Sequence, residues 1–501
     1  MLSSIVEHNI AKPVGKVFAF FIDFKAAFDT VNRSSLLYKL ENVGVSSKII
    51  EAVRNIYSHT TAKVWTKLGF TDVFSTYSGV RQGCLLSPLL FTIFINDLCD
   101  DIDLGGFCYN GVWIRLLMYA DDIVFLAADP ETLQGMIDKL ANYCERWDLV
   151  VNLAKSKVVV FRKPSMLKKS FGWTYNGVKI EIVKEYKYLG VLFTSSGRFS
   201  VHMDRQLAVA KCALNTVYRR VFKIGAVNLD SYLKIFEAVA RSIVCYAAQV
   251  WGHQKFDPVE KTYRFFLKKL LRLPYNTPNY MLFLEMAQDS IYLYALKIHW
   301  SFLLKTLKLE DGRFRKIMLE VGQVYELDWF KQLKSLAQEF DLWEGLTDFS
   351  YENLEGTFET LLEKVREKER QFMWEQVRDG TMHPIYKNIK FNWGREKYLE
   401  IGLPIKSVGL IFMARTDMLP LNYKPWFDGG EDQRDYKCTF CDMQADENVE
   451  HFLLICPKFR QFRSEGFQNT SCFDILEGAL GWYELAKFLS NAINYRSFLL
   501  Q

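Results

Sequence analysis

Three aspartates stand where a carboxylate is difficult to keep without a cation. Asp23 lies near the end of the apolar run 17–24, which is typical of a buried strand, and Asp121 and Asp122 fill the turn of a strand–turn–strand segment over 112–128. An unpaired buried carboxylate costs free energy, and hard cations prefer oxygen ligands. Two such cations ~3.5–4 Å apart can activate an attacking hydroxyl and stabilise a departing pyrophosphate. The residue types alone leave an ordinary polar turn open as the alternative, because Asp is common in turns.

A second group of potential ligands lies near the C-terminus. Cys438 and Cys441 are separated by two residues, His451 follows after nine more, and Cys456 after another four. Three thiolates and one imidazole are enough to close a tetrahedral structural zinc site. We therefore expect one structural Zn²⁺ here, whereas Cys472 lies outside the spacing.

The elements that must position the three aspartates form a mixed α and β region up to about residue 200. Short strands in this region indicate an antiparallel sheet. Pro88 favours the start of a helix at Ser87. The other expected elements are a helix over 32–58 broken at 42–44, a hairpin over 61–77, an amphipathic helix over 131–148, and strands at 157–161 and 186–193.

Beyond residue 200 the chain is predicted to be mostly helical and locally basic. Residues 201–310 contain 16 Lys and Arg against 8 Asp and Glu. Arg264, Lys268 and Arg272 recur at helical spacing and would form one basic stripe, which can follow a phosphate backbone. The alternative for this stripe is a solvated helix face.

The bulk composition narrows the class of protein. A chain of 501 residues, half of them hydrophobic, predicts two to four domains with a large core. Its scattered cysteines indicate a reducing compartment, and neither a secretory signal nor a membrane span is visible. We therefore expect an intracellular protein in the nucleus, the cytoplasm or both. Its oligomeric state stays open.

Five sequence motifs carry a resemblance to a known family. They are FFIDFKAAFD at 20–29, SGVRQGCLLSPLLF at 78–91, YADD at 119–122, VNLAKSK at 151–157 and YLG at 188–190. In order and spacing they resemble the palm motifs of reverse transcriptases from non-LTR (LINE-type) retrotransposons. The segment HFLLICP at 451–457 is similar to the C-terminal zinc knuckle of the same elements.

The resemblance implies a fold and an activity. The fold would be α+β: a right-hand polymerase palm with an antiparallel sheet, then a mostly α-helical thumb and C-terminal region with a small zinc knuckle. The expected ranges are palm 1–195, thumb-like region 196–310, helical connector 311–430 and knuckle region 431–501, with a linker at Gly429-Gly430. The activity would be RNA-directed DNA polymerase with two Mg²⁺. Its partners would be an RNA template, a DNA primer or target, and deoxynucleoside triphosphates.

The resemblance also implies a role for each residue of the motifs. Asp23, Asp121 and Asp122 would hold the two Mg²⁺, assisted by the carbonyl of Phe24. Lys155 would protonate the pyrophosphate leaving group, with Lys157 as the rival. The remaining substrate-binding residues would be Phe28, whose ring meets the sugar 2′ position, Arg81 toward template or phosphate, Gln82 and Gly83 at the incoming nucleotide, and Tyr119 beside the catalytic turn.

Two departures from the family pattern are visible. Leu85 stands where relatives usually carry Pro, and we expect a small effect at most. Only 22 residues precede Asp23, so we expect most of the fingers, and the endonuclease, to be absent. The leading hypothesis is an active polymerase. A nucleic-acid-binding remnant and a host-adapted regulatory DNA-binding protein are the rivals.

Overall fold

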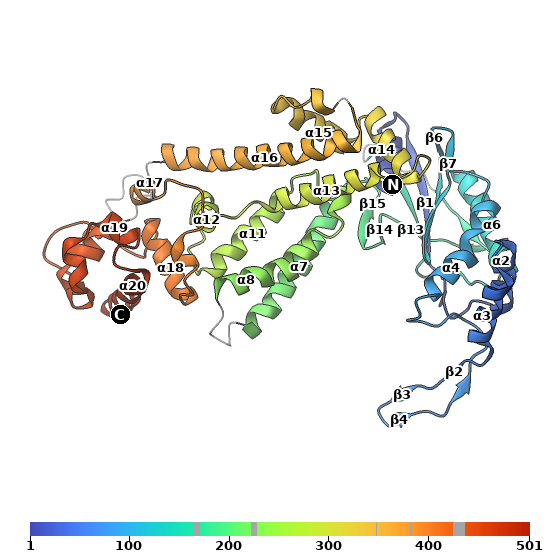
Figure 1. Ribbon diagram of the computed structural model, residues 1–501, viewed down its shortest axis with the longest axis horizontal. Coiled ribbons are helices and arrows are strands. Elements are labelled where there is room, and N and C mark those ends of the chain that lie inside the picture. The colour runs from blue at the N-terminus through green and yellow to red at the C-terminus, as the bar shows by residue number, and fades with distance from the viewer. Residues whose placement is uncertain (164–170, 222–227, 347, 381–382, 424–435) are drawn as a thin grey trace. The chain divides into compact units, whose positions relative to one another are not determined.

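The computed structural model describes the chain except residues 164–170, 222–227, 347, 381–382 and 424–435 (Figure 1). The chain divides into two compact units. The first contains Met1–His202 and Lys305–Leu333, and the second contains Met203–Leu304 and Lys334–Gln501. Both of the predicted ranges 196–310 and 311–430 therefore contribute residues to each unit, and the functional names of the ranges stay predictions. The predicted linker at Gly429-Gly430 lies outside the described residues.

The first unit is built on a five-stranded sheet with the order β13-β10-β1-β9-β8. The central strand β1 (Lys16–Ile22) pairs antiparallel with β9 (Asp122–Ala127) and β10 (Lys157–Arg162). At the two edges, β8 (Leu116–Tyr119) pairs antiparallel with β9, and β13 (Ile182–Val183) pairs parallel with β10. The predicted antiparallel sheet is thus confirmed for four strands, with one short parallel strand added.

Both faces of β1 are covered, which explains its almost continuous apolar sequence. Phe18, Phe20 and Ile22 enter one large core together with side chains of several helices. On the alternate positions, Phe21 stacks on Tyr186 with ring centroids 4.4 Å apart. The helices of this core include α2 (Arg33–Asn42), α4 (Ser87–Asn96) and α6 (Pro130–Arg146).

Most local predictions for the first unit are confirmed. α2 and α3 (Ser47–Ser58) are separate helices with the break near Gly44, and α4 begins at Ser87 with Pro88 in its first turn. The 61–77 hairpin is present as two paired ladders, β2 (Thr61–Ala62) with β5 (Phe74–Ser75) and β3 (Trp65–Thr66) with β4 (Gly69–Phe70). The single strand predicted over 186–193 is wrong. It is a hairpin of β14 (Glu185–Tyr188) and β15 (Val191–Thr194), because Leu189 and Gly190 both take positive φ.

A helix from far along the sequence completes the first unit. α14 (Phe314–Val324) packs against α1 (Leu2–Ala11) and the hairpin of β6 (Phe107–Tyr109) with β7 (Val112–Ile114). The amide of Asn110 donates to the Glu320 carboxylate at 2.8 Å. The backbone N–H of Asp328, at the start of α15 (Asp328–Glu339), donates to the Glu7 carboxylate at 2.6 Å.

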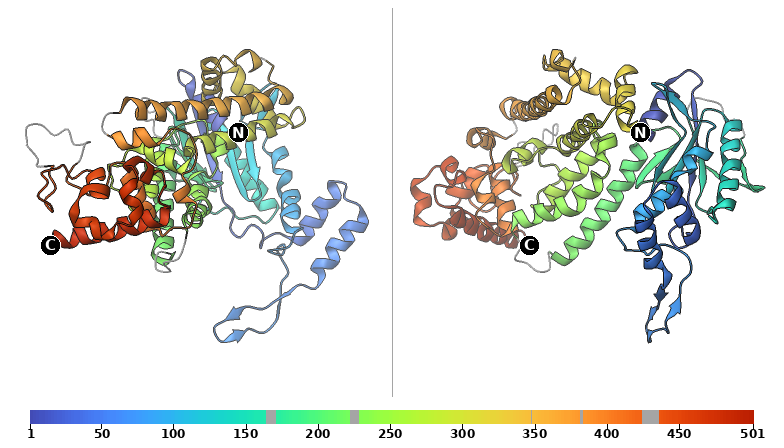
Figure 2. Two further views of the ribbon diagram at one scale, coloured as in Figure 1. Left: turned by 60° about the vertical axis from the view of Figure 1, so that its left-hand side comes forward. Right: turned by 45° about the vertical axis from the view of Figure 1, so that its right-hand side comes forward.

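The second unit is mostly helical, as predicted for the chain after residue 200. Its helices include α7 (Ser200–Val221), α8 (Leu229–Ile235), α11 (Asp257–Leu270), α12 (Asn279–Met286), α13 (Ile291–Leu307), the 29-residue α16 (Tyr351–Asp379), α17 (Pro384–Ile389), α18 (Ile405–Arg415) and α20 (Trp482–Leu499) (Figures 1 and 2). A fully buried ion pair of Glu285 with Arg415 joins α12 to α18. Among the described helices of the chain, none combines the length and the apolar character that crossing a membrane requires.

Candidate active site and C-terminal metal centre

Asp23 is held in place by the loop that precedes β10. Its backbone N–H donates to the hydroxyl of Ser156 at 2.9 Å, and its carbonyl accepts from the backbone N–H of Asn152 at 2.7 Å. The side-chain amide of Asn152 donates to the Asp23 carboxylate at 2.9 Å. Three hydrogen bonds therefore fix both the backbone and the side chain of Asp23 at the end of β1.

Asp121 and Asp122 are brought to the same end of the sheet by strand register. Ile22 pairs with Ile123, so Asp122 begins β9 beside the position where β1 delivers Asp23. Ala120 takes a positive φ of 53°, which makes the tight turn after Tyr119. Partial burial and then the charges of Asp121 and Asp23 raise the pKa of Asp122 above its ordinary value. The three predicted aspartates therefore converge, and their mutual repulsion is the kind that a bound cation relieves.

The two rival lysines have different surroundings. The Lys155 ammonium lies 3.8 Å from the Asp23 carboxylate, and its side chain is 70% exposed. The Lys157 ammonium instead forms a 2.7 Å ion pair with Glu181, and its side chain is largely covered. Lys155 thus has both the proximity to the aspartates and the freedom to reach a substrate. Lys157 is engaged at the edge of the sheet.

Two tyrosines beneath the aspartates were not singled out from the sequence. Tyr186 stacks on Phe21, and burial, followed by the charges of Asp23 and Asp122, raises its pKa to about 12. Burial likewise raises the pKa of Tyr188 well above its ordinary value, with a contribution from Asp122. Both phenols therefore stay neutral at physiological pH and add no negative charge near the carboxylates. The signal was weak, because Tyr188 lies in the fifth motif and Tyr186 lies just outside it.

Phe28 and Phe24 lie on the chain that leaves β1. The half-buried ring of Phe28 stacks on Phe91 of α4, with ring centroids 4.7 Å apart. The carbonyl of Phe28 accepts from the backbone N–H of Val80, which ties the first motif to the second. Phe24 is buried and forms an isolated antiparallel bridge with Val151. Phe28 is therefore rigidly placed, five residues after Asp23.

The other predicted substrate residues lie in the loop before α4 or at the catalytic turn. Gln82 donates to the carboxylate of Asp29 at 3.1 Å, and Gly83 has a φ of +82° with open space where a side chain would be. The guanidinium of Arg81 donates to the carbonyl of Ile56 at 2.9 Å, so it is partly engaged within the fold. Tyr119 is 68% exposed at the end of β8.

Arg33 organises this loop, and the motifs did not point to it. Its guanidinium donates to the carbonyls of Tyr57, Thr76, Ser78 and Gly79. A side chain at Gly79 would meet the backbone of Asp29 at 2.7–2.9 Å, and the φ of Gly79 is +82°. One partly buried fork of donors thus holds the second motif close to the end of the first, which helps to position Gln82.

The predicted basic stripe of the helical region is not formed as expected. α11 ends at Leu270, and Arg272 follows it with a φ of 55°. Lys268 is buried, and its ammonium donates to the carbonyl of Tyr275 at 2.9 Å. Burial, together with the nearby Arg264 charge, lowers the pKa of Lys268. The prediction of one exposed stripe is therefore wrong. Contact of Arg264, Lys268 and Arg272 with nucleic acid stays a prediction.

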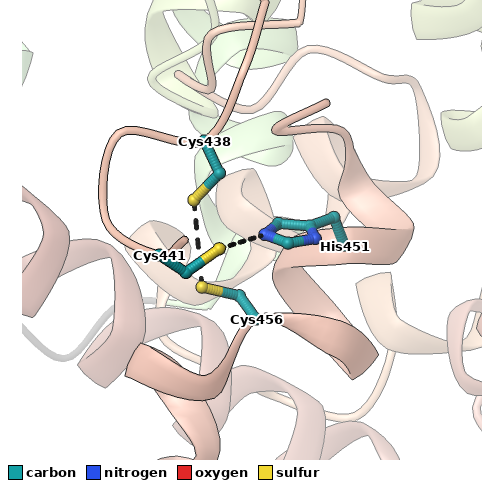
Figure 3. Close-up of side chains that lie close together, drawn as sticks. All are labelled: Cys438, Cys441, His451 and Cys456. Carbon is teal, nitrogen blue, oxygen red and sulfur yellow. Dashed lines mark hydrogen bonds between the residues drawn. The ribbon is translucent and has the colours of Figure 1, made fainter. Parts of the chain in front are cut away.

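The four C-terminal ligands come together (Figure 3). The ligand atoms of Cys438, Cys441, His451 and Cys456 all lie within 4.8 Å of one another. A tetrahedral zinc ion with Zn–S of about 2.3 Å and Zn–N of about 2.0–2.1 Å separates two sulfurs by about 3.8 Å, and a sulfur from a nitrogen by about 3.5 Å. The Cys438 and Cys456 sulfurs are 3.9 Å apart, and the Cys441 sulfur is 3.5 Å from Nε2 of His451. The cluster therefore fits a tetrahedral metal ion.

The surroundings of the cluster favour a closed site. Burial raises the pKa of the Cys438 thiol to about 12 and also raises the pKa of Cys456, so a cation is needed to keep the thiolates charged. Burial also lowers the pKa of His451, which favours the neutral imidazole that a metal requires. The guanidinium of Arg463 donates to the carbonyls of Leu453, Phe452 and Cys456. Arg463 therefore braces the ligand loop.

Comparison with known proteins places this geometry in context. Residues 2–193 match the family described as Reverse transcriptase (RNA-dependent DNA polymerase). The RNA-directed DNA polymerase from mobile element jockey of Drosophila funebris is 27% identical over 267 residues, which cover 52% of this chain and 28% of that protein. The Pol polyprotein of the type-2 retrotransposable element R2DM of Drosophila melanogaster is 22% identical over 271 residues, covering 51% of this chain and 24% of that protein.

A solved structure and the matched lengths complete the comparison. Apo telomerase from Candida tropicalis is 15% identical and has a TM-score of 0.32, over 64% of this chain and 55% of that chain. The chain spans less than a third of the length of the two curated relatives described above.

Proposed function

We propose that the chain is an RNA-directed DNA polymerase, because residues 2–193 match the reverse transcriptase family and the chain is similar to the polymerase of mobile element jockey. It extends the 3′-hydroxyl of a DNA primer on an RNA template. The observation that carries the proposal is the convergence of Asp23, Asp121 and Asp122 at one end of the sheet, where the pKa of Asp122 is raised by its two neighbours.

The carboxylate cluster would hold two Mg²⁺. Asp23, Asp121 and Asp122 supply oxygen ligands, and Asn152 and Ser156 hold Asp23 in position for them. When bound, the ions lower the pKa of the attacking hydroxyl and neutralise charge on the phosphates. Lys155 lies close enough to donate a proton to the departing pyrophosphate.

The surrounding residues would bind and select the nucleotide. The ring of Phe28, fixed by its stack on Phe91, would exclude a ribose 2′-hydroxyl. Gln82 and Gly83 would line the nucleotide site, Arg81 would face template or phosphate, and exposed Tyr119 would lie beside the primer end. One structural Zn²⁺ would be held by Cys438, Cys441, His451 and Cys456.

Primer extension tests the proposal directly. The purified chain is incubated with a DNA primer on an RNA template, the four deoxynucleoside triphosphates and Mg²⁺, beside the double variant Asp121→Ala, Asp122→Ala. We expect DNA synthesis by the parent chain and none by the variant. Absence of synthesis by the parent chain, with template–primer binding retained, would overturn the polymerase proposal and leave a nucleic-acid-binding protein.

A further inference from the structure

A groove in the second unit is lined by residues of α16 and α17, in a stretch for which the sequence predicted only helix. Its volume is about 800 Å³, which is within the usual range of ligand sites. On α16 it is lined by Glu367, Arg370, Gln371, Trp374, Val377 and Arg378, which recur at helical spacing along one face. On and after α17 it is lined by Lys387, Lys390 and Phe391.

The charges of the groove are mostly positive. Four of its lining residues are Lys or Arg, and Glu367 is its single acid. Lys390 is ion-paired with Glu396, and Arg370 with Asp289. Neither Arg378 nor Lys387 has an acidic partner within the part of the chain that the structure describes, and both are exposed. The groove therefore keeps two cations available for an anionic ligand.

Two aromatic rings accompany these cations. Phe391 is 67% exposed, although it directly follows the buried residues Ile389 and Lys390, and Trp374 is partly exposed on α16. Lys387 donates to the carbonyl of Arg378 at 2.5 Å, which keeps the end of α16 close to α17 and the cations close to each other. Rings interleaved with unpaired cations in an open groove are the combination that holds stacked bases along a phosphate backbone.

We propose that the α16–α17 groove binds a single strand of nucleic acid. Phosphates contact Arg378 and Lys387, and bases stack on Trp374 and Phe391. This site is separate in sequence and in residues from the carboxylate cluster of the first unit, so binding at the groove does not depend on polymerase activity.

Binding of a short strand to an already loaded chain tests the proposal. The full chain is first saturated with a template–primer duplex, and labelled oligo(rU) or oligo(dT) of eight nucleotides is then titrated by fluorescence anisotropy. We expect additional binding that weakens at least tenfold in Arg378→Glu, Lys387→Glu, while the affinity for the duplex changes less than twofold. Loss of two phosphate contacts also lowers the slope of log affinity against log salt by about 1.4. Whichever oligonucleotide binds more tightly identifies the strand as RNA or DNA.

Matched variants separate the groove from general effects. Lys397→Glu, Lys487→Glu makes the same change of charge at exposed sites of the second unit outside the groove, and should leave the affinity within twofold. Trp374→Ala, Phe391→Ala should weaken binding about tenfold or more, whereas Trp374→Phe should retain most of it. Phe372→Ala removes an equally exposed ring of α16 that does not line the groove.

Three outcomes would overturn the proposal: no additional binding of either oligonucleotide, binding that both groove variants leave unchanged, or equal loss in the Lys397, Lys487 control. Ultraviolet crosslinking of the bound oligonucleotide, followed by peptide mapping, gives a second readout. Adducts should fall on the peptides that contain Trp374 or Phe391. Adducts confined to other peptides would also contradict the groove.

Discussion

The aspartates of the first unit and the Cys/His ligands of the second unit are held in opposite ways. Asp23 is partly exposed, and the pKa of Asp122 is raised in part by the neighbouring aspartates. Cys438, His451 and Cys456 are buried, and the separations of the ligand atoms match a closed tetrahedron. The aspartates are therefore accessible to solvent, whereas the Cys and His ligands are largely shielded from it.

From this difference we infer whether the ligands of each site contribute to catalytic rate or to folding stability. At an open site, the surrounding fold holds the ligands in position. Here Asn152 and Ser156 hold Asp23 through hydrogen bonds. Its ligands therefore contribute to rate and little to stability. A closed site of buried thiols has no other source of compensation for its desolvation than the metal itself. Its ligands therefore contribute to folding. The variants below test this division.

The largest effect is expected at the closed site. Cys456→Ser should abolish zinc binding and unfold the segment around residues 437–462, because structural zinc contributes about 10 kcal/mol or more to such folds. Metal analysis and hydrogen exchange measure the two consequences. Cys212→Ser, the same change at an exposed cysteine of α7, should alter neither. Zinc retained in the Cys456 variant would contradict the closed tetrahedron.

Loss of a carboxylate at the open site should lower the rate of catalysis without lowering the stability of the fold. Asp122→Asn should lower the rate of primer extension by at least about 10³-fold, because a metal contributes several kcal/mol to the transition state and each factor of ten is about 1.4 kcal/mol. The thermal midpoint of the first unit should stay the same or rise, since the substitution removes repulsion from Asp121 and Asp23. Asp138→Asn on the exposed face of α6 is the control. A marked fall in stability would break the comparison.

The two lysines near the open site should differ in their contribution to the rate. Lys155→Ala should lower the maximal rate of extension about 10²-fold, the lower range of general-acid contributions. Lys157→Ala should change the rate little, because Lys157 is ion-paired with Glu181 at 2.7 Å. Rates are measured under single-turnover conditions with saturating nucleotide. A larger loss of rate in the Lys157 variant would reverse the assignment.

The sequence predicted most local elements of the first unit and the proximity of the four Cys and His residues, for physical reasons. The apolar run ending at Asp23 and the C-x2-C spacing at Cys438 are short-range patterns, and short-range geometry restricts where such side chains can go. The pairing of β1 with β9 agrees with the expected convergence of the aspartates, because it brings Asp23 and Asp122 to one end of the sheet.

Long-range burial could not be predicted in this way. The stripe at Arg264, Lys268 and Arg272 failed because helical spacing does not reveal what covers a helix or where it ends. The packing of α14 on the first unit depends on pairs such as Asn110 with Glu320, which are 210 residues apart and carry no local pattern. The role of Arg33 was missed for the same reason, because its acceptors are backbone carbonyls and leave no signature in the sequence.

The smallest effect is expected at a buried carboxyl group of the second unit that lies outside the metal ligands, and it tests whether this group is shielded from water. Asp417 is buried, accepts a hydrogen bond from the backbone N–H of Ile385 at 3.2 Å, and has its pKa raised by burial from 3.8 to about 7. A carboxyl group whose folded pKa is raised binds its proton more tightly in the folded state. The stability it contributes is present below pH 3.8 and is lost as the pH rises through about 7.

Asp417→Asn keeps an acceptor for Ile385 and removes the ionisation. In the parent chain, Asp417 should make the free energy of unfolding fall by at most about 1.4 kcal/mol per pH unit between pH 4 and 7. The variant should lack this fall, and urea unfolding at several pH values measures it. Asp138→Asn in the first unit should leave that slope in place, because Asp138 is exposed. Equal slopes in the parent chain and the Asp417 variant would show that water reaches this carboxyl group and that burial does not raise its pKa.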